Sequence, residues 1–117
     1  MGKLTTHVLD TTAGAAAAGM RIDFAAVDAN GVHAIRTVYT NAHGRTDESL
    51  LAGDTMRGGR FQLTFHVADY FRRQGHVLAD PPFLECVPIR FGIADAEAHY
   101  HVPFLCSPWA YSTYRGS

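Results

Sequence analysis

The stretch RFQLTFHV, residues 60–67, alternates strictly between polar and apolar side chains. Every second residue from Phe61 to Val67 is apolar, and the residues between them, from Arg60 to His66, are polar or charged. Because successive side chains of a β-strand point to opposite faces, this two-residue period is typical of a strand that buries one face. Residues 60–67 therefore predict a half-buried β-strand.

Three other stretches follow the same period and predict further strands. In VPIRFGIA (87–94) the apolar positions are 89, 91 and 93, and in MRIDFAAVD (20–28) they are 22, 24 and 26. The turn signal DANG (28–31) separates the second of these from HAIRTVYT (33–40). A turn sequence between two strand patterns favours an antiparallel pair, so residues 20–40 predict a β-hairpin.

Only VADYFRRQG (67–75) departs from the two-residue period. Val67, Tyr70 and Phe71 recur at helical spacing, and Gly75 stands where a helix commonly ends. This segment predicts one short helix. Seven or eight short strands with regular turns and a single helix indicate an all-β fold, an antiparallel β-sandwich that forms one domain over residues 1–117.

Composition excludes several classes of partner. The chain is 47% hydrophobic and 18% charged, and 10 Lys and Arg oppose 11 Asp and Glu, so no basic excess exists to bind nucleic acid. The alanine-rich stretch 11–20 is too short to span a bilayer. With no export signal recognised, we expect a cytoplasmic protein without a membrane partner, in which Cys86 and Cys106 are buried small hydrophobes and form no disulfide.

Histidines on two predicted strands are the first candidates for chemistry. In KLTTHVLD (3–10), Thr5, His7 and Leu9 share one face. In HYHVPFLC (99–106) the face opposite the apolar core positions carries His99 and His101.

These histidines admit three interpretations. The first is that they are ordinary surface or hydrogen-bonded side chains. The second is that the His-x-His pair binds a metal ion, with His7 as a third ligand. The third is that two of the imidazoles form a metal-free acid–base pair that activates water beside a cation. The residues alone do not separate the three. Ser/His/Asp catalysis is a poor fit, because no G-x-S-x-G pattern occurs.

The turn NAHGRTD and the C-terminal tail YRGS supply the other candidates. Arg45 is the best-placed cation on a turn, although a solvated loop charge would look the same. We expect the last strand to continue to the end of the chain, and alternation then places Arg115 and Ser117 on one face and Tyr114 on the other. One site could then use both Tyr114 and Arg115 only if the strand twists or two subunits share the site.

Several segments together resemble the transthyretin-like family, on its hydrolase branch. They are LTTHVLDTTAGAAAAGM (4–20), TNAHGRTD (40–47), GGRFQLTFHVADYF (58–71), PIRFGIAD (88–95) and above all HYHVPFLCSPWAYSTYRGS (99–117). The ending YRGS is the mark that separates the hydrolases of this family from its hormone carriers, and the resemblance covers essentially the whole chain.

The resemblance implies a sandwich of two four-stranded sheets with a short helix, assembled as a homotetramer with its sites at the dimer–dimer interface. The implied reaction belongs to urate degradation. Water opens the ring of 5-hydroxyisourate to give 2-oxo-4-hydroxy-4-carboxy-5-ureidoimidazoline. No metal or organic cofactor is implied.

Site residues carried over from the family are His7, Arg45, His101, Tyr114, Arg115 and Ser117. The resemblance implies that His101 or His7 takes a proton from water, and that the other histidine or the Ser117 hydroxyl relays it to the leaving nitrogen. Arg45 would bind a substrate carbonyl and stabilise the oxyanion. Tyr114 would help to bind the ring. Arg115 would bind substrate or, more in keeping with its place, anchor the tail.

Two other functions remain open at this point. The same fold serves as a non-catalytic carrier of small aromatic ligands, although carriers are expected to lack the two histidines, the turn arginine and the YRGS ending together. The other function is that of a histidine-rich β-sandwich that binds a metal ion, and metal analysis of the purified protein tests it.

Overall fold

The computed structural model describes all residues from Met1 to Ser117, and most of its regular secondary structure is β-strand. The elements in chain order are β1 (Lys3–Asp10), β2 (Ala15–Ala16), β3 (Arg21–Asp28), β4 (Gly31–Tyr39), β5 (Leu51–Ala52), the 3-10 helix η1 (Gly53–Thr55), β6 (Gly59–Phe65), α1 (Val67–Arg73), β7 (Val87–Ile93), β8 (His99–Cys106) and β9 (Tyr111–Thr113).

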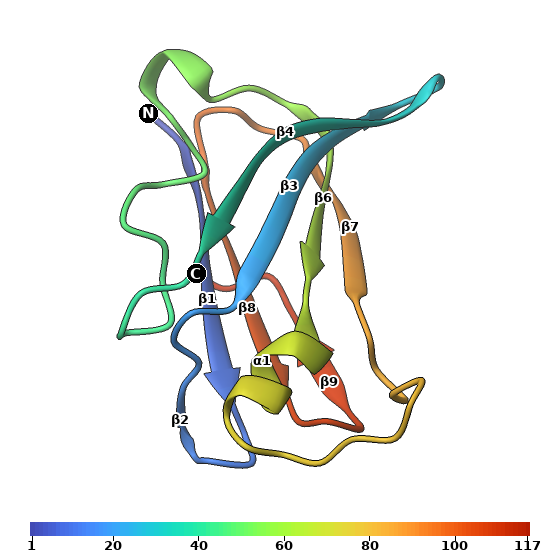
Figure 1. Cartoon of the computed structure of the whole chain (residues 1–117). Helices are drawn as coiled ribbons and strands as arrows, with labels where there is room; N and C mark the ends of the chain where they lie inside the picture. The colour runs from blue at the N-terminus through green and yellow to red at the C-terminus, as the bar shows by residue number, and fades with distance from the viewer.

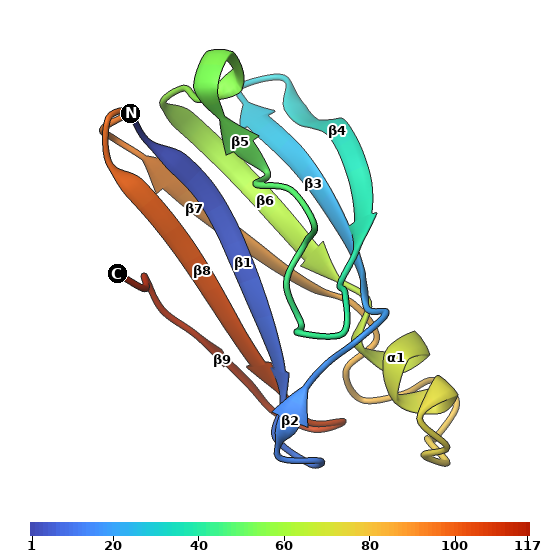
Figure 2. The same ribbon diagram turned by 90° about the vertical axis from the view of Figure 1, so that its left-hand side faces the viewer.

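The strands form two sheets that pack face to face, as Figures 1 and 2 show. One sheet has the order β2-β1-β8-β9, and β5 adds a fifth short strand by pairing with β1. The other has the order β4-β3-β6-β7. The predicted β-sandwich is confirmed, and the only departure from two four-stranded sheets is the two-residue β5.

The hairpin and the helix lie where the sequence predicts them. β3 and β4 pair in antiparallel register and their tip projects beyond the sandwich (Figure 1). α1 begins at Val67, directly after β6, and lies at one end of the sandwich, where it buries Val67, Ala68, Tyr70 and Phe71.

The prediction of a wholly antiparallel sandwich is wrong at one strand pair. β1 and β8 run parallel, with Thr5 opposite His101 and His7 opposite Pro103. Alternation reveals which residues share a face, but it carries no information on strand direction, and these strands are separated by most of the chain. The parallel pair brings the histidines of both strands onto one surface.

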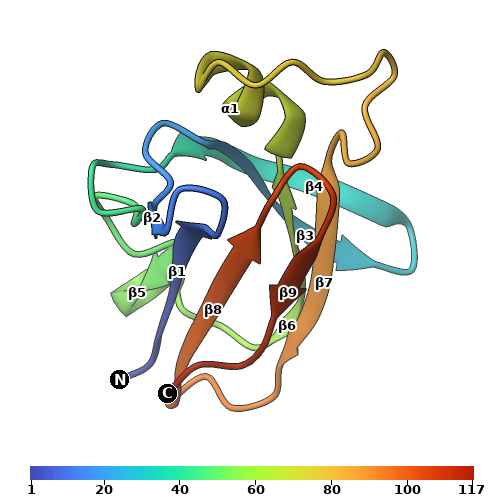
Figure 3. The same ribbon diagram turned by 90° about the horizontal axis from the view of Figure 1, so that it is seen from below.

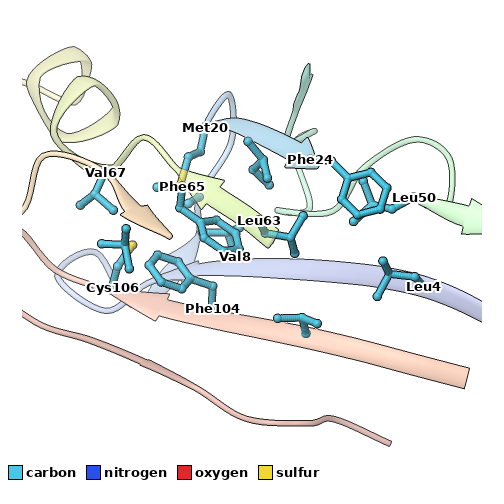
Figure 4. Packing of buried hydrophobic residues seen from close by; sticks show 14 of the residues in the cluster. Leu4, Val8, Met20, Phe24, Leu50, Leu63, Phe65, Val67, Phe104 and Cys106 are labelled. Carbon is cyan, nitrogen blue, oxygen red and sulfur yellow. The ribbon is translucent and has the colours of Figure 1, made fainter. Parts of the chain in front are cut away.

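The core fills the space between the sheets (Figure 4). Phe65 of β6 stacks on Phe104 of β8 with ring centroids 4.0 Å apart, which joins the two layers at their centre. Cys106 is buried in this core as expected, but Cys86 is exposed, so its assignment as a buried hydrophobe was wrong. Cys86 lies just before β7 starts, where the chain has left the sheet. Both thiols are free.

None of the helices has the length and apolar character that crossing a membrane requires.

Candidate active site

His7 and His101 lie together on the outer face of the β1–β8 sheet. Neighbours on each strand point inward: Thr6 and Val8 are buried, as is Val102. The two imidazole rings are therefore outward neighbours, with centroids 6.4 Å apart and planes inclined by 37°. The parallel strand pair thus brings the two imidazoles close together on one surface.

Thr5 orients the His101 ring. Its Oγ1 lies 2.8 Å from His101 Nδ1, directly across the parallel pair. A ring whose Nδ1 is engaged in this way keeps Nε2 free for proton transfer, and the hydrogen bond fixes the ring plane. Thr5 was not among the candidates that the sequence suggested, although its place on the same face as His7 was a usable signal.

Arg45 approaches His7 from a tight loop. A backbone bridge pairs the two residues, and the carbonyl of the preceding Gly44 accepts from Val8 N at 2.8 Å. Gly44 has φ +75°, and a Cβ there would collide with the Val8 carbonyl, so only glycine lets the loop approach β1 so closely. The Arg45 guanidinium forms no hydrogen bond or ion pair within the chain.

Asn41 holds this loop in shape. Its side-chain oxygen accepts from the backbone N–H groups of His43 and Arg45, and its own backbone N–H donates to the Arg45 carbonyl at 2.7 Å. The amide nitrogen donates to Asp47. Asn41 was not a sequence candidate either, because Asn in a turn is usual whether or not the turn serves a site.

The surroundings of both histidines lower their pKa and so favour the neutral imidazole. Burial and the positive charge of Arg45 lower the pKa of His7, against a hydrogen bond to the backbone of His43 that raises it. Burial, Arg45 and His7 lower the pKa of His101. Near pH 7 the site therefore offers two neutral imidazoles beside a cation, which is the state that a general base needs.

The C-terminal tail crosses His101. β9 ends at Thr113, so the expectation of a strand to the chain end was wrong, and Gly116 then rejoins β8 by donating its N–H to the His101 carbonyl at 2.8 Å. A Cβ at Gly116 would lie 2.8 Å from His101 Cδ2. Figure 3 shows the tail running from β9 along β8 to the C-terminus. The close approach explains why a glycine stands before Ser117.

Tyr114 and Arg115 meet His101, but not His7, at one cavity. Both line a cavity of about 230 Å³ at the sandwich edge between β7 and the β8–β9 pair, and Tyr114 remains 61% exposed. The Arg115 guanidinium lies over the Tyr100 ring at 4.1 Å and donates to the His99 carbonyl at 3.3 Å. Because β9 ends at Thr113, the side chains of Tyr114 and Arg115 are not forced onto opposite faces of a strand, and both can line one cavity. The contacts of Arg115 with Tyr100 and His99 hold the tail against β8.

No group of three or more His, Cys, Asp or Glu side chains is placed to hold a metal ion. His99 is exposed and lies outside the contacts that join His7, His101 and Arg45.

Fold and site together define a class, a two-sheet β-sandwich whose parallel β1 and β8 present two imidazoles, with Arg45 on a neighbouring loop and the C-terminal tail against His101. The model of the HIUase/Transthyretin family matches residues 4–116. The chain belongs to the HIUase/Transthyretin family, as the resemblance predicted.

Similar proteins include 5-hydroxyisourate hydrolases and a transthyretin. The chain is 56% identical to 5-hydroxyisourate hydrolase 2 of Rhizobium meliloti over 99% of this chain and 97% of the relative, and 37% identical to the mouse 5-hydroxyisourate hydrolase over 97% and 94%. The solved structure of the Klebsiella pneumoniae hydrolase matches over the full length of both chains at 32% identity and TM-score 0.81.

Two further structures extend the comparison. An (S)-allantoin synthase superposes with TM-score 0.92 at 40% identity over 99% of this chain, which spans only 44% of that protein. Sea bream transthyretin in complex with thyroxine gives TM-score 0.85 at 25% identity, over 97% of this chain and 94% of that one.

Proposed function

We propose that the protein hydrolyses 5-hydroxyisourate to 2-oxo-4-hydroxy-4-carboxy-5-ureidoimidazoline, a step of urate degradation. The observation that carries this proposal is the pair of imidazoles, His7 and His101, beside Arg45, where burial and the charge of Arg45 lower the pKa of both rings. Relatives that are 56% and 37% identical over nearly the whole chain bear the name of that hydrolase.

The reaction begins with general-base activation of water. His101, with Nδ1 directed to Thr5, accepts the proton of a water molecule at Nε2 as that water attacks the substrate carbonyl. His7, 6.4 Å away between ring centroids, is the second acid–base group. It, or the Ser117 hydroxyl, passes a proton to the ring nitrogen that leaves when the C–N bond breaks. No metal or organic cofactor takes part in these steps.

Arg45 binds the substrate and stabilises the charge that develops during attack. Its guanidinium has no partner within the chain and is free to donate to a carbonyl or oxyanion. Asn41 and Gly44 fix the backbone of the loop at Arg45, so the loop itself requires little reordering when substrate binds.

Tail residues complete the site indirectly. Arg115, stacked on Tyr100 and bonded to the His99 carbonyl, anchors the tail, and Gly116 brings the tail backbone onto His101. Tyr114 lines the same cavity as His101 and contributes there a wall for the ring of the substrate.

The working assembly is a homotetramer with sites where dimers meet. Tyr111, Tyr114 and Trp109 are large exposed side chains on or beside β9, an edge strand with one unpaired side. Light scattering after gel filtration tests the assembly, since a tetramer has four times the 12.8 kDa mass of the chain. With two free thiols and no disulfide, the cytoplasm is its expected location.

Activity is tested by generating 5-hydroxyisourate in situ from urate and urate oxidase and following its ultraviolet decay. Decay well above the spontaneous rate supports the hydrolase. A carrier of small aromatic ligands would leave the decay at its background rate and would bind the compound stoichiometrically, and that result overturns the proposal.

A further inference from the structure

A second group of reactive side chains, Cys86, His66 and Asp23, lies apart from the histidine pair in the fold. Cys86 Sγ is 3.4 Å from His66 Nδ1, and His66 Nε2 is 2.8 Å from Asp23 Oδ2. Thiol, imidazole and carboxylate form one continuous line of contacts. A nucleophile beside a base that a third group orients is the arrangement that activates side chains for covalent chemistry.

Strand register creates this line of contacts. Phe65 pairs with Val87 at the last step of the β6–β7 ladder. His66 follows Phe65 and Cys86 precedes Val87, so the two side chains face each other one step beyond the ladder. Both also leave the core, in contrast to Phe65 and Val87, which are buried.

Asp23 fixes the tautomer of His66. Burial favours the neutral acid, but hydrogen bonds from His66, Thr37 and Arg21 lower the pKa of Asp23 to about 2. The carboxylate is therefore ionised and can only accept hydrogen bonds. The hydrogen of neutral His66 then lies on Nε2, and Nδ1 is left with a lone pair directed to Cys86.

Cys86 needs that base. Partial burial of the thiol and the carboxylates of Glu85 and Asp69 raise the pKa of Cys86, so the thiol is protonated near pH 7. The residue as a whole is nevertheless exposed. Cys106 provides an internal contrast, because it is 1% exposed and burial raises its pKa to about 12. Of the two thiols only Cys86 combines access with a base.

This group is separate from the site of the proposed hydrolase. On β3 the side chains beside Asp23, Ile22 and Phe24, are buried in the core, so Asp23 points away from it. It thus lies on the outer face of the β4-β3-β6-β7 sheet, whereas His7 and His101 lie on the outer face of the other sheet. The two sheets pack face to face, so these outer faces point in opposite directions (Figure 2).

We propose that Cys86 is a nucleophilic modification site for small disulfides, with His66 as its general base and Asp23 as the positioning residue. In the reaction the S–H bond of Cys86 breaks and its proton passes to His66 Nδ1. Sγ bonds to one sulfur of the disulfide, whose S–S bond breaks. The second sulfur leaves as a thiolate and takes up the proton from His66, so the protein thiol is oxidised to a mixed disulfide and the leaving sulfur is reduced to a thiol.

The test is the rate at which the full-length protein reacts with the neutral disulfide dithiodipyridine, followed by the absorption of the released thiopyridone. We expect one thiol per chain to react quickly, with mass spectrometry placing the adduct on Cys86 and Cys86→Ser removing it. His66→Asn slows this phase at pH 7 by about 10-fold or more. His33→Asn, which changes a more exposed histidine that is also bonded to an aspartate, leaves it unchanged.

The pH dependence of the wild-type protein tests the role of His66 even where a variant folds poorly. Base assistance gives an inflection in the rate that depends on the imidazole, so His66→Asn abolishes it and Asp23→Asn, which keeps the base but changes its partner, weakens it. A wild-type rate that rises in simple proportion to hydroxide concentration and equals that of His66→Asn would overturn the proposal, as would an adduct on Cys106. None of these measurements depends on hydrolase activity.

Discussion

The backbone N–H of Gly116 donates to the carbonyl of His101 at 2.8 Å, so the tail of the chain lies directly against a histidine ring of the candidate active site. A Cβ on residue 116 would lie 2.8 Å from His101 Cδ2 and 3.3 Å from Pro103 Cγ. The position of the ring and the position of the tail are therefore set together.

Gly116→Ala tests that coupling. The added methyl group pushes the His101 ring out of place, because a contact under 3.0 Å to a ring carbon requires a shift. We expect kcat for 5-hydroxyisourate to fall by roughly 10-fold or more, since small displacements at a reacting centre are costly. Gly92→Ala is the matched control, because a Cβ there meets nothing within 4 Å. Equal activity of the two variants would contradict the coupling.

Thr5→Val removes the hydroxyl that contacts His101 Nδ1 at 2.8 Å and keeps a β-branched side chain on β1. Loss of ring orientation lowers kcat by about 10-fold with little change in KM, because the change affects proton transfer rather than substrate binding. Steady-state kinetics measure the split. Thr64→Val on the opposite sheet is the control, and a loss confined to KM would argue against an orienting role for Thr5.

Arg45→Gln separates charge from geometry through the pH profile. Burial and the charge of Arg45 lower the pKa of both His7 and His101, so each stays neutral to lower pH than an ordinary histidine. Removing the charge raises both pKa values, and the acid limb of kcat/KM against pH moves to higher pH. Arg45→Lys keeps the positive charge, so the acid limb of its pH profile should stay where it is in the wild type. An unmoved limb in Arg45→Gln would show that Arg45 does not act on the histidines.

Tyr70→Phe tests a buried polar contact that supports the end of β1. The Tyr70 hydroxyl donates to Asp10 Oδ2 at 2.8 Å, and Asp10 is only 2% exposed. Removing the hydroxyl leaves a buried carboxylate oxygen without its donor, which costs about 1–3 kcal/mol of unfolding free energy. Urea unfolding measures the loss. Tyr39→Phe, at a 57% exposed tyrosine, should change little, and similar losses in both variants would contradict this account.

The sequence predicts the faces of the strands well, because burial imposes a two-residue period that any sheet must obey. Leu63 and Phe65 of β6 are fully buried, as the pattern at residues 60–67 requires. For the same reason the outward direction of His7 and His101 follows from the alternation of their own strands.

Contacts between distant segments are not readable in this way. The parallel pairing of β1 with β8 decides that Thr5 lies opposite His101, and strand direction leaves no trace in a local pattern. The line from Cys86 through His66 to Asp23 likewise joins three segments whose register is fixed only by the folded sheet. From alternation we predict that the last strand runs to the end of the chain, but β9 ends at Thr113 and Gly116 then pairs with His101.

The most direct test of the central claim is the decay of 5-hydroxyisourate with the wild-type protein, with His101→Asn and with His33→Asn. The account predicts rapid decay with the wild type and with His33→Asn, and a loss of about 10²–10⁴-fold with His101→Asn while its circular dichroism and thermal unfolding stay unchanged. Wild-type decay at the spontaneous rate, or full activity of a folded His101→Asn, would contradict it.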